Sequence, residues 1–443
     1  MAENNLNAAD ALRAKVFKIL TGEKTPPAAF LSYAPGGLAQ SDFTLRFLKE
    51  AKYTTEAFTF ERLADSVPLG VGDWVESTTN LSEIYTNWLD QYEPPPFSLT
   101  PEEQKKLDDA EKFILNNYDN YVQYQGEFQN TYVSWYTLVV MPEADRPPDY
   151  GTKLALAKNK MDAADKAWNI KGQRGKYDTN YAIVQDLSQR DPTRTKETLR
   201  TKLGQPLTSP LGEYYPTRIM PTNLLDTGFE WPKFSFYHNE VHEYEQNDSY
   251  RWGGSASYGA LLWSASAEHE GQKKYAEHKT DISNMKIEFE LLRAPIIRPW
   301  FSTVLLRGRG WKWRNSTKED PTGGNPFSDG KIPPEQGNLP MIPTEAIFAR
   351  NLTVKLDMSS TANKESLLAT QSKAEAGWGL FKIKGSVETS NGTKSYDFVE
   401  EADGITCNQP QIIGFFSELM PMTPNPNWAL WDKKLTAAGS GSE

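Results

Sequence analysis

The chain has 443 residues, a formal net charge of −10 and one cysteine, Cys407. Its length exceeds what a single hydrophobic core normally covers, so two or three domains are expected. The acidic balance argues against a general nucleic-acid-binding protein, because such affinity depends on Lys and Arg neutralising phosphates. A single cysteine excludes an intrachain disulfide, and with it a disulfide-stapled secreted scaffold.

No secretory signal is evident near the amino terminus. Residues 1–20 lack a continuous apolar segment, and no stretch of the chain approaches 18 consecutive apolar residues. These patterns predict cytoplasmic synthesis without a signal peptide, which leaves release by a non-classical route open. The final residues 439–443, Gly-Ser-Gly-Ser-Glu, have the composition of a flexible linker and carry no fold information.

Residues 1–96 are predicted to form a small, mainly helical region. Apolar residues recur at helical spacing over residues 6–21, and Gly22 stands where a helix stop is expected. A second short helix is predicted near residues 81–92, because apolar residues there are three and four apart. The prolines at 94–96 then end it and begin a stiff linker.

The strongest local signal predicts a long helical hairpin over residues 97–204. Thr100-Pro101-Glu102-Glu103 has the pattern of a capping box with proline at the first helical position. The helix is expected to continue to residue 141, with a bend at Gly126 left open. After a proline-rich turn the second arm follows. It is interrupted at residues 172–175, continues through Tyr181, Val184 and Leu187, and begins again after the cap pair Asp191-Pro192.

The residues expected between the two arms are largely Tyr, Phe and Trp. Aromatic side chains lose rotamer freedom in a helix, so their use indicates a broad packing surface. Three interpretations stay open. The seam forms an ordinary bundle core, it belongs to a projecting arm that contacts a partner subunit, or the hairpin is membrane-active.

Residues 205–230 are expected to be a surface connector, and residues 231–438 a β-sandwich domain. Apolar and polar residues alternate with a period of two, as in strands with one buried face, in the stretches 285–291, 348–356 and 381–387. Residues 411–416 are apolar on both faces and predict a central strand, and Asn391-Gly392 favours a tight hairpin turn. The predicted fold class is therefore α+β, with a helical front half, a long antiparallel helical hairpin and a carboxy-terminal antiparallel β-sandwich.

A metal site is one candidate in the segment 238–242. His238, Glu240 and His242 would share one face if this segment were a strand, and these residue types are zinc ligands. A third firm ligand is not visible, and the glutamate does not stand beside the first histidine as zinc proteases require. A solvated or hydrogen-bonded sheet face is the favoured alternative.

The segment 307–314 is the sharpest candidate for recognition, because four cations alternate with two indoles. Such a surface could hold an anionic glycan, a phosphate or an acidic partner by charge and stacking. The alternative is an intramolecular cation–π stack. The candidate contact residues are Arg307, Arg309, Trp311, Lys312, Trp313 and Arg314.

Residues 255–267 are rich in serine, alanine and other small residues. Pore-forming proteins insert hairpins of this composition, because such strands can lie first in water and later in lipid. Leu261 and Leu262 would point to opposite faces, so the alternation is imperfect. An ordinary strand packed closely against a neighbour is the favoured interpretation.

No nucleophile elbow, phosphate loop or dinucleotide fingerprint occurs, so neither a cofactor nor a catalytic residue is predicted. The motifs do not identify a family of known function. We expect a non-enzymatic, self-associating structural or assembly protein, a homo-oligomer that makes subunit or ligand contacts through its helical arm and aromatic-rich β domain. A pore-forming or membrane-active protein and a carbohydrate-binding β-sandwich are the alternatives, and no nucleic-acid partner is expected.

Overall fold

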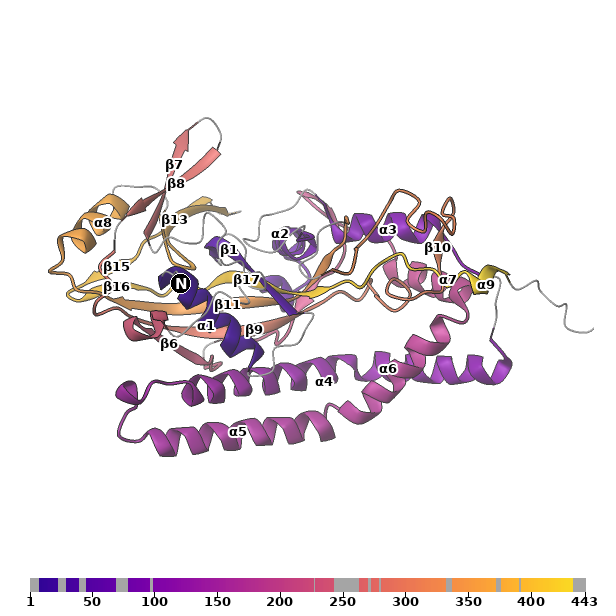
Figure 1. Ribbon diagram of the computed structural model, residues 1–443, viewed down its shortest axis with the longest axis horizontal. Coiled ribbons are helices and arrows are strands. Elements are labelled where there is room, and N and C mark those ends of the chain that lie inside the picture. The colour runs from indigo at the N-terminus through magenta and orange to yellow at the C-terminus, as the bar shows by residue number, and fades with distance from the viewer. Residues whose placement is uncertain are drawn as a thin grey trace, which may run out of the picture.

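The computed structural model describes residues 8–22, 29–39, 45–68, 79–95, 99–226, 228–242, 263–269, 272–278, 280–331, 337–371, 376–389 and 392–432. The fold is α+β, as predicted. A large antiparallel sheet runs along the molecule, and a long helical hairpin lies against one side of it (Figure 1).

The helices up to residue 204 include those that the sequence predicts. They are α1 (Ala8–Thr21), α2 (Thr54–Asp65), α3 (Leu81–Gln91), α4 (Pro101–Val139), α5 (Tyr150–Ile170), α6 (Arg174–Ser188) and α7 (Pro192–Leu203), with 3₁₀ turns η2 (Arg46–Leu48) and η3 (Glu143–Asp145). Of these, α2 was not predicted from the sequence. Its residues are apolar on one face only, and no capping side chain marks its start.

The capping box at the start of α4 is confirmed. The Glu103 backbone N–H donates to Thr100 Oγ1 at 3.3 Å, and the Thr100 N–H donates to Glu103 Oε2 at 3.0 Å. The helix then continues for 39 residues, without interruption at Gly126. The cap pair at residue 191 is also confirmed, because the Asp191 carboxylate accepts a hydrogen bond from the Arg194 N–H at 3.1 Å.

The strands form one large sheet and one smaller sheet. The eight-stranded sheet contains β1 (Ala29–Ala39), β5 (Arg218–Ile219), β6 (Lys233–Tyr237), β9 (Lys286–Ile297), β11 (Met341–Lys355), β15 (Val399–Glu401), β16 (Gly404–Cys407) and β17 (Gln411–Leu419). The five-stranded sheet contains β7 (Trp263–His269), β8 (Gln272–His278), β12 (Ala376–Trp378), β13 (Phe381–Thr389) and β14 (Gly392–Tyr396). Two short ribbons pair β2 (Tyr92–Glu93) with β10 (Lys312–Trp313), and β3 (Leu207–Ser209) with β4 (Gly212–Tyr214).

Strand β17 is central, as its two apolar faces predict. It pairs with β1 on one side and with β11 on the other, and every residue of it except Glu418 is buried. Strand β13 is followed directly by its antiparallel partner β14, with Thr389 opposite Gly392. The predicted turn residue Asn391 lies outside the described residues.

The amino-terminal region takes part in the β body. Strand β1 adds to the edge of β17, and α1 packs into the largest hydrophobic core together with residues of β6, β9 and β13. The sequence pattern predicted neither this strand nor the helix α8 (Thr361–Gln371), which interrupts the β half. The remaining elements are the 3₁₀ helix η4 (His238–His242) and the short helix α9 (Ala429–Asp432).

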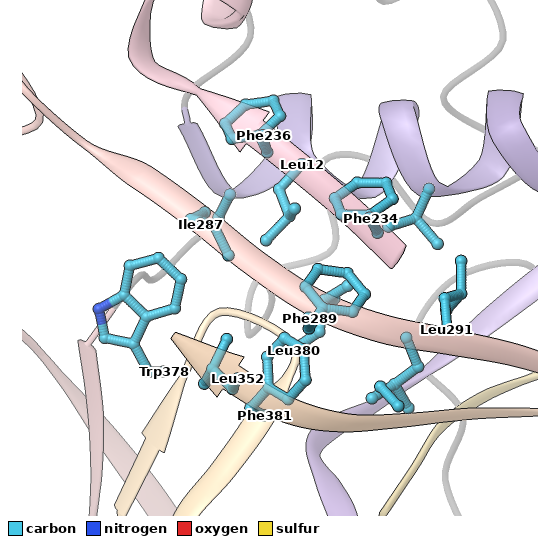
Figure 2. Close-up of a cluster of buried hydrophobic side chains, with 14 of the residues drawn as sticks. Leu12, Phe234, Phe236, Ile287, Phe289, Leu291, Leu352, Trp378, Leu380 and Phe381 are labelled. Atoms are coloured by element: carbon cyan, nitrogen blue, oxygen red, sulfur yellow. The ribbon is translucent and has the colours of Figure 1, made fainter. Parts of the chain in front are cut away.

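The largest core lies where α1, the large sheet and the smaller sheet meet (Figure 2). Phe234 of β6 stacks on Phe289 of β9 with ring centroids 4.4 Å apart, and Phe381 of β13 meets Phe289 edge-on at 4.9 Å. Leu12 of α1 lies in the same cluster. This packing of two sheets and a helix gives the β half its sandwich-like character.

The helical arm is fastened to the sheet by paired polar contacts. Asn130 of α4 accepts from the Arg293 backbone N–H at 3.1 Å and donates to the Arg293 carbonyl at 3.2 Å. The Arg293 guanidinium forms a two-point ion pair with Glu345 of β11, at 2.6 and 2.8 Å, and also donates to the Leu20 carbonyl at 2.6 Å. One arginine therefore joins α1, β9 and β11 beneath α4.

Candidate functional site

The indoles of the predicted recognition segment are buried. Trp311 is 0% exposed and Trp313 is 5% exposed. Their Nε1 atoms donate to the carbonyls of Leu306 and Asn325, at 3.2 and 3.0 Å. Both rings belong to a core that also contains Trp88 of α3. These two indoles therefore lie in the core and not on an exposed recognition surface, and Trp313 stands opposite Tyr92 in the pairing of β10 with β2.

Most cations of this segment make contacts within the chain. Arg307 donates to Glu418 at 2.8 Å, Lys312 forms an ion pair with Glu93 at 3.2 Å, and Arg309 donates to the Asn425 carbonyl at 3.2 Å. Arg314 is exposed. The structure thus separates the six candidates into a buried aromatic pair, three cations that contact different neighbours, and the exposed Arg314.

The segment 238–242 is the 3₁₀ helix η4, which corrects its prediction as a strand. With about three residues per turn, positions two and four apart do not share one face. Glu240 is fully buried, and its carboxylate accepts from Lys15 Nζ at 2.5 Å and from the Tyr237 N–H at 2.8 Å. The side chain of His242 lies outside the described part of the chain, within which no group of three or more His, Cys, Asp or Glu side chains is placed to hold a metal ion.

The serine- and alanine-rich stretch is described only in part, since residues 255–262 lie outside the described residues. From Trp263 the chain forms β7, which pairs with β8 and with β12. Among the described helices, none is both long and apolar enough to cross a membrane.

The aromatic seam of the arm is an internal packing surface. Tyr121 of α4 stacks on Tyr177 of α6 with ring centroids 3.9 Å apart, and Trp168 of α5 contacts both Tyr121 and Phe128 at 5.6 Å. Burial, together with the charge of Asp178, raises the pKa of Tyr121 to about 12. Burial, and then the neighbouring phenol of Tyr118, raises the pKa of Tyr177 well above its usual range. These phenols stay neutral and hold the arms together.

The outer helix α5 presents a different face to solvent. It lies on the side of α4 that faces away from the large sheet (Figure 1), and only Ala164 and Trp168 of its 21 residues are buried. Leu156 is 56% exposed, Ile170 is 75% exposed, and Ala163 between them is exposed as well. Because residues seven apart return to nearly the same side of a helix, these three residues form one outward stripe.

This outward stripe was missed in the sequence. The aromatic residues expected in the seam, such as Trp168, mark one face of α5. Leu156, Ala163 and Ile170, spaced seven apart on another face, are also visible in the sequence as a repeat. Which face of a two-helix hairpin meets the sheet depends on tertiary packing. The sequence pattern alone could not identify the free face.

The comparisons with known proteins add no functional information. No protein-family model, no curated protein and no solved structure shows significant similarity to this chain.

Proposed function

We propose that the chain is a non-enzymatic assembly protein that self-associates through the outward stripe of α5. The observation that supports this proposal is the symmetry of the stripe. Leu156 and Ile170 lie seven residues before and after Ala163, which is small enough to let two helices approach closely. In a two-fold interface each residue pairs with its symmetry-related counterpart, and this spacing fits that requirement.

The proposed contact is an antiparallel pairing of α5 with α5 of a second copy. Ala163 would lie at the two-fold axis opposite its own copy, and Leu156 of one chain would pack against Ile170 of the other. Because the two apolar residues are equally spaced about Ala163, a second copy in antiparallel orientation meets the stripe with matching residues of its own. The second copy is therefore the favoured occupant.

The charges on α5 are compatible with close approach. Lys153 and Lys158 form ion pairs with Asp149 and Asp162, each at 3.0 Å, one helical turn away. Lys160 lies 3.5 Å from Glu230. Since each of these cations has an acidic neighbour in its own chain, repulsion between two copies is reduced.

The first test measures molar mass by light scattering over a wide range of protein concentration. The wild type is expected to form a dimer or a higher even-numbered species, and the double variant Leu156→Lys with Ile170→Lys is expected to be a monomer. Leu368→Lys is the matched control, because Leu368 is an equally exposed leucine on the helix α8, at 64% exposure. A wild-type protein that is monomeric at high micromolar concentration and shows no rings or filaments in negative-stain images would contradict the proposal.

The second test locates the two-fold axis by cross-linking. The only native cysteine, Cys407, is buried, so any disulfide cross-link between two chains is expected to form at the introduced thiol. Ala163→Cys is expected to give a covalent dimer on mild oxidation. Ala155→Cys, an exposed alanine eight residues earlier and about 80° round the helix, is the control that should stay monomeric. Equal cross-linking at both positions would show random collision rather than the proposed pairing.

A membrane-active function is the alternative that the arm and residues 255–267 leave open. Release of dye from liposomes separates it from assembly, which leaves vesicles intact. The carbohydrate-binding alternative loses the observation that motivated it, because Trp311 and Trp313 are buried. No described feature favours it over assembly.

A further inference from the structure

A patch of three cations lies where α7 meets the end of α3 and the ribbon of β2 and β10 (Figure 1). Lys196 and Arg200 belong to α7, and Arg314 directly follows β10. Arg314 is among the residues predicted to contact a ligand, whereas the two cations of α7 were not predicted. The patch lies apart from the outer helix α5, which carries the outward stripe (Figure 1).

Lys196 and Arg200 are held at the carboxy-terminal end of α3. Lys196 Nζ donates to the Tyr92 carbonyl at 2.9 Å and lies 4.3 Å from the centroid of the Tyr92 ring. Arg200 Nη2 donates to the Leu89 carbonyl at 3.2 Å and to Asp90 Oδ1 at 2.6 Å. Cations at this end of a helix satisfy its last carbonyls and oppose the negative end of its dipole. These contacts fix both side chains and leave further N–H groups on each without a partner among the described residues.

Arg314 has no such anchor. Its side chain is exposed, and its guanidinium makes no hydrogen bond or ion pair with any residue that the structure describes. The ribbon nevertheless fixes its place in the chain, because the preceding residue, Trp313, stands opposite Tyr92. Since the Tyr92 carbonyl holds Lys196, the backbone at Arg314 lies beside the cations of α7.

The positive charges of the patch exceed the negative charge around them. Burial, and then the charges of Arg200 and Arg314, lower the pKa of Lys196. Asp90 acts in the opposite direction but is a single carboxylate. Lys196 and Arg200 are also four residues apart on α7, a spacing at which like charges repel. The patch is therefore a local excess of positive charge on a chain whose net charge is −10.

We propose that Lys196, Arg200 and Arg314 bind the phosphate group of a small phosphomonoester. Such a group carries a charge of about −1.5 to −2 at pH 7 and has three acceptor oxygens, so it can accept from all three cations. The two guanidinium groups suit it further, because their forked N–H groups match the spacing of phosphate oxygens.

The surroundings of the patch favour a compact dianion over other anions. A carboxylate or a sulfate ester carries one charge and would leave part of the repulsion among the cations uncompensated. A long polyanion would meet Asp90 and Glu93 beside the patch, and then the negative charge of the whole chain. A small phosphomonoester avoids both costs.

Phosphorus NMR of phenyl phosphate, titrated with the full chain at pH 7.5 and low ionic strength, tests the proposal. The signal should shift and broaden until the protein is saturated. The affinity should fall about threefold or more between about 20 and about 200 mM sodium chloride, because salt screens exposed charges. Phenyl sulfate, a monoanion of similar shape, should compete about fivefold more weakly or less.

Substitutions separate the patch from the charge of the whole chain. Arg314→Gln removes an exposed side chain without contacts, so the variant should fold normally and bind about fivefold more weakly or less. Lys196→Gln should weaken binding as well, with urea unfolding as the check that it is folded. Arg309→Gln is the matched control, because Arg309 is exposed in the same segment and is held by the Asn425 carbonyl. It loses the same charge and should bind as the wild type does.

Four results would overturn the proposal. They are the absence of saturable binding, equal competition by phenyl sulfate, wild-type affinity in Arg314→Gln, and an equal loss of affinity in Arg309→Gln. The last of these would show attraction to the general field of the segment. The test is independent of self-association through α5, because Leu156→Lys with Ile170→Lys leaves the patch intact and should bind phenyl phosphate as the wild type does.

Discussion

Lys15 of α1 and Glu240 of η4 form a buried ion pair between residues 225 positions apart in the chain, with Nζ 2.5 Å from Oε1. The two side chains are 2% and 0% exposed. The ammonium also lies within 6 Å of the ring centroids of Phe234, Phe236 and Tyr237. This pair joins the amino-terminal helix to the β body.

Removing one partner of this pair should be strongly destabilising. Lys15→Met leaves a buried carboxylate without its cation, and such losses cost about 3–5 kcal/mol. The double variant Lys15→Met with Glu240→Gln should recover part of that free energy of unfolding, because no isolated charge is then buried. Urea unfolding of the single and double variants measures the difference. Equal stability of Lys15→Met and the wild type would show that the pair is not buried in solution.

The contact between Asn130 and the Arg293 backbone should hold the arm on the sheet. Asn130→Ala removes both hydrogen bonds to Arg293 and should lower the free energy of unfolding by about 1–3 kcal/mol. Asn120, an exposed asparagine on the same helix, provides the control, and Asn120→Ala should change stability by less than about 0.5 kcal/mol. Hydrogen exchange of the β9 amides should be faster in Asn130→Ala alone.

The buried carboxylates Glu61 and Asp65 of α2 should make stability depend on pH. The pKa of Glu61 is about 8 in the folded chain against an ordinary value of 4.5. The folded state therefore keeps a proton that the unfolded state loses, and the free energy of unfolding should fall as pH rises from about 5 to 8. The effect of this group is at most about 5 kcal/mol.

Glu61→Gln should flatten that dependence, because glutamine does not titrate. The variant is expected to be more stable than the wild type above pH 8. Glu83→Gln changes an exposed carboxylate at the cavity that Glu61 also lines, and the charge of Glu83 contributes to the raised pKa of Asp65. It should alter the slope much less than Glu61→Gln does. Denaturant midpoints collected from pH 5 to 9 give the comparison, and parallel curves for wild type and Glu61→Gln would contradict it.

The indole of Trp311 should act in folding and not in recognition. Trp311→Ala removes a fully buried ring and should destabilise the protein by about 3–5 kcal/mol. Arg314→Ala, at an exposed position in the same segment, should stay within about 0.5 kcal/mol of the wild type. Thermal or urea unfolding of both variants provides the measurement. A stable Trp311→Ala would place this ring at the surface instead.

Local chemistry in the sequence determined much of the secondary structure. The capping box at Thr100, the cap at Asp191 and the two apolar faces of β17 follow from interactions within a few residues or from a period of two, and all are present in the fold. Helices α2 and α8 were missed. Helix α2 has one apolar face but no side-chain cap at its start, and the apolar pattern of α8 is weak, so tertiary packing contributes to the stability of both.

Only the tertiary structure decided which surfaces are free and which groups meet. It paired β1 with β17, turned Trp311 inward and opposed Lys15 to Glu240. It also grouped Glu61 and Asp65 with Asn80 around a cavity and left one face of α5 uncovered. Burial and electrostatic pairing depend on segments far apart in the chain. The local periodicity that predicts a helix or strand does not contain that information.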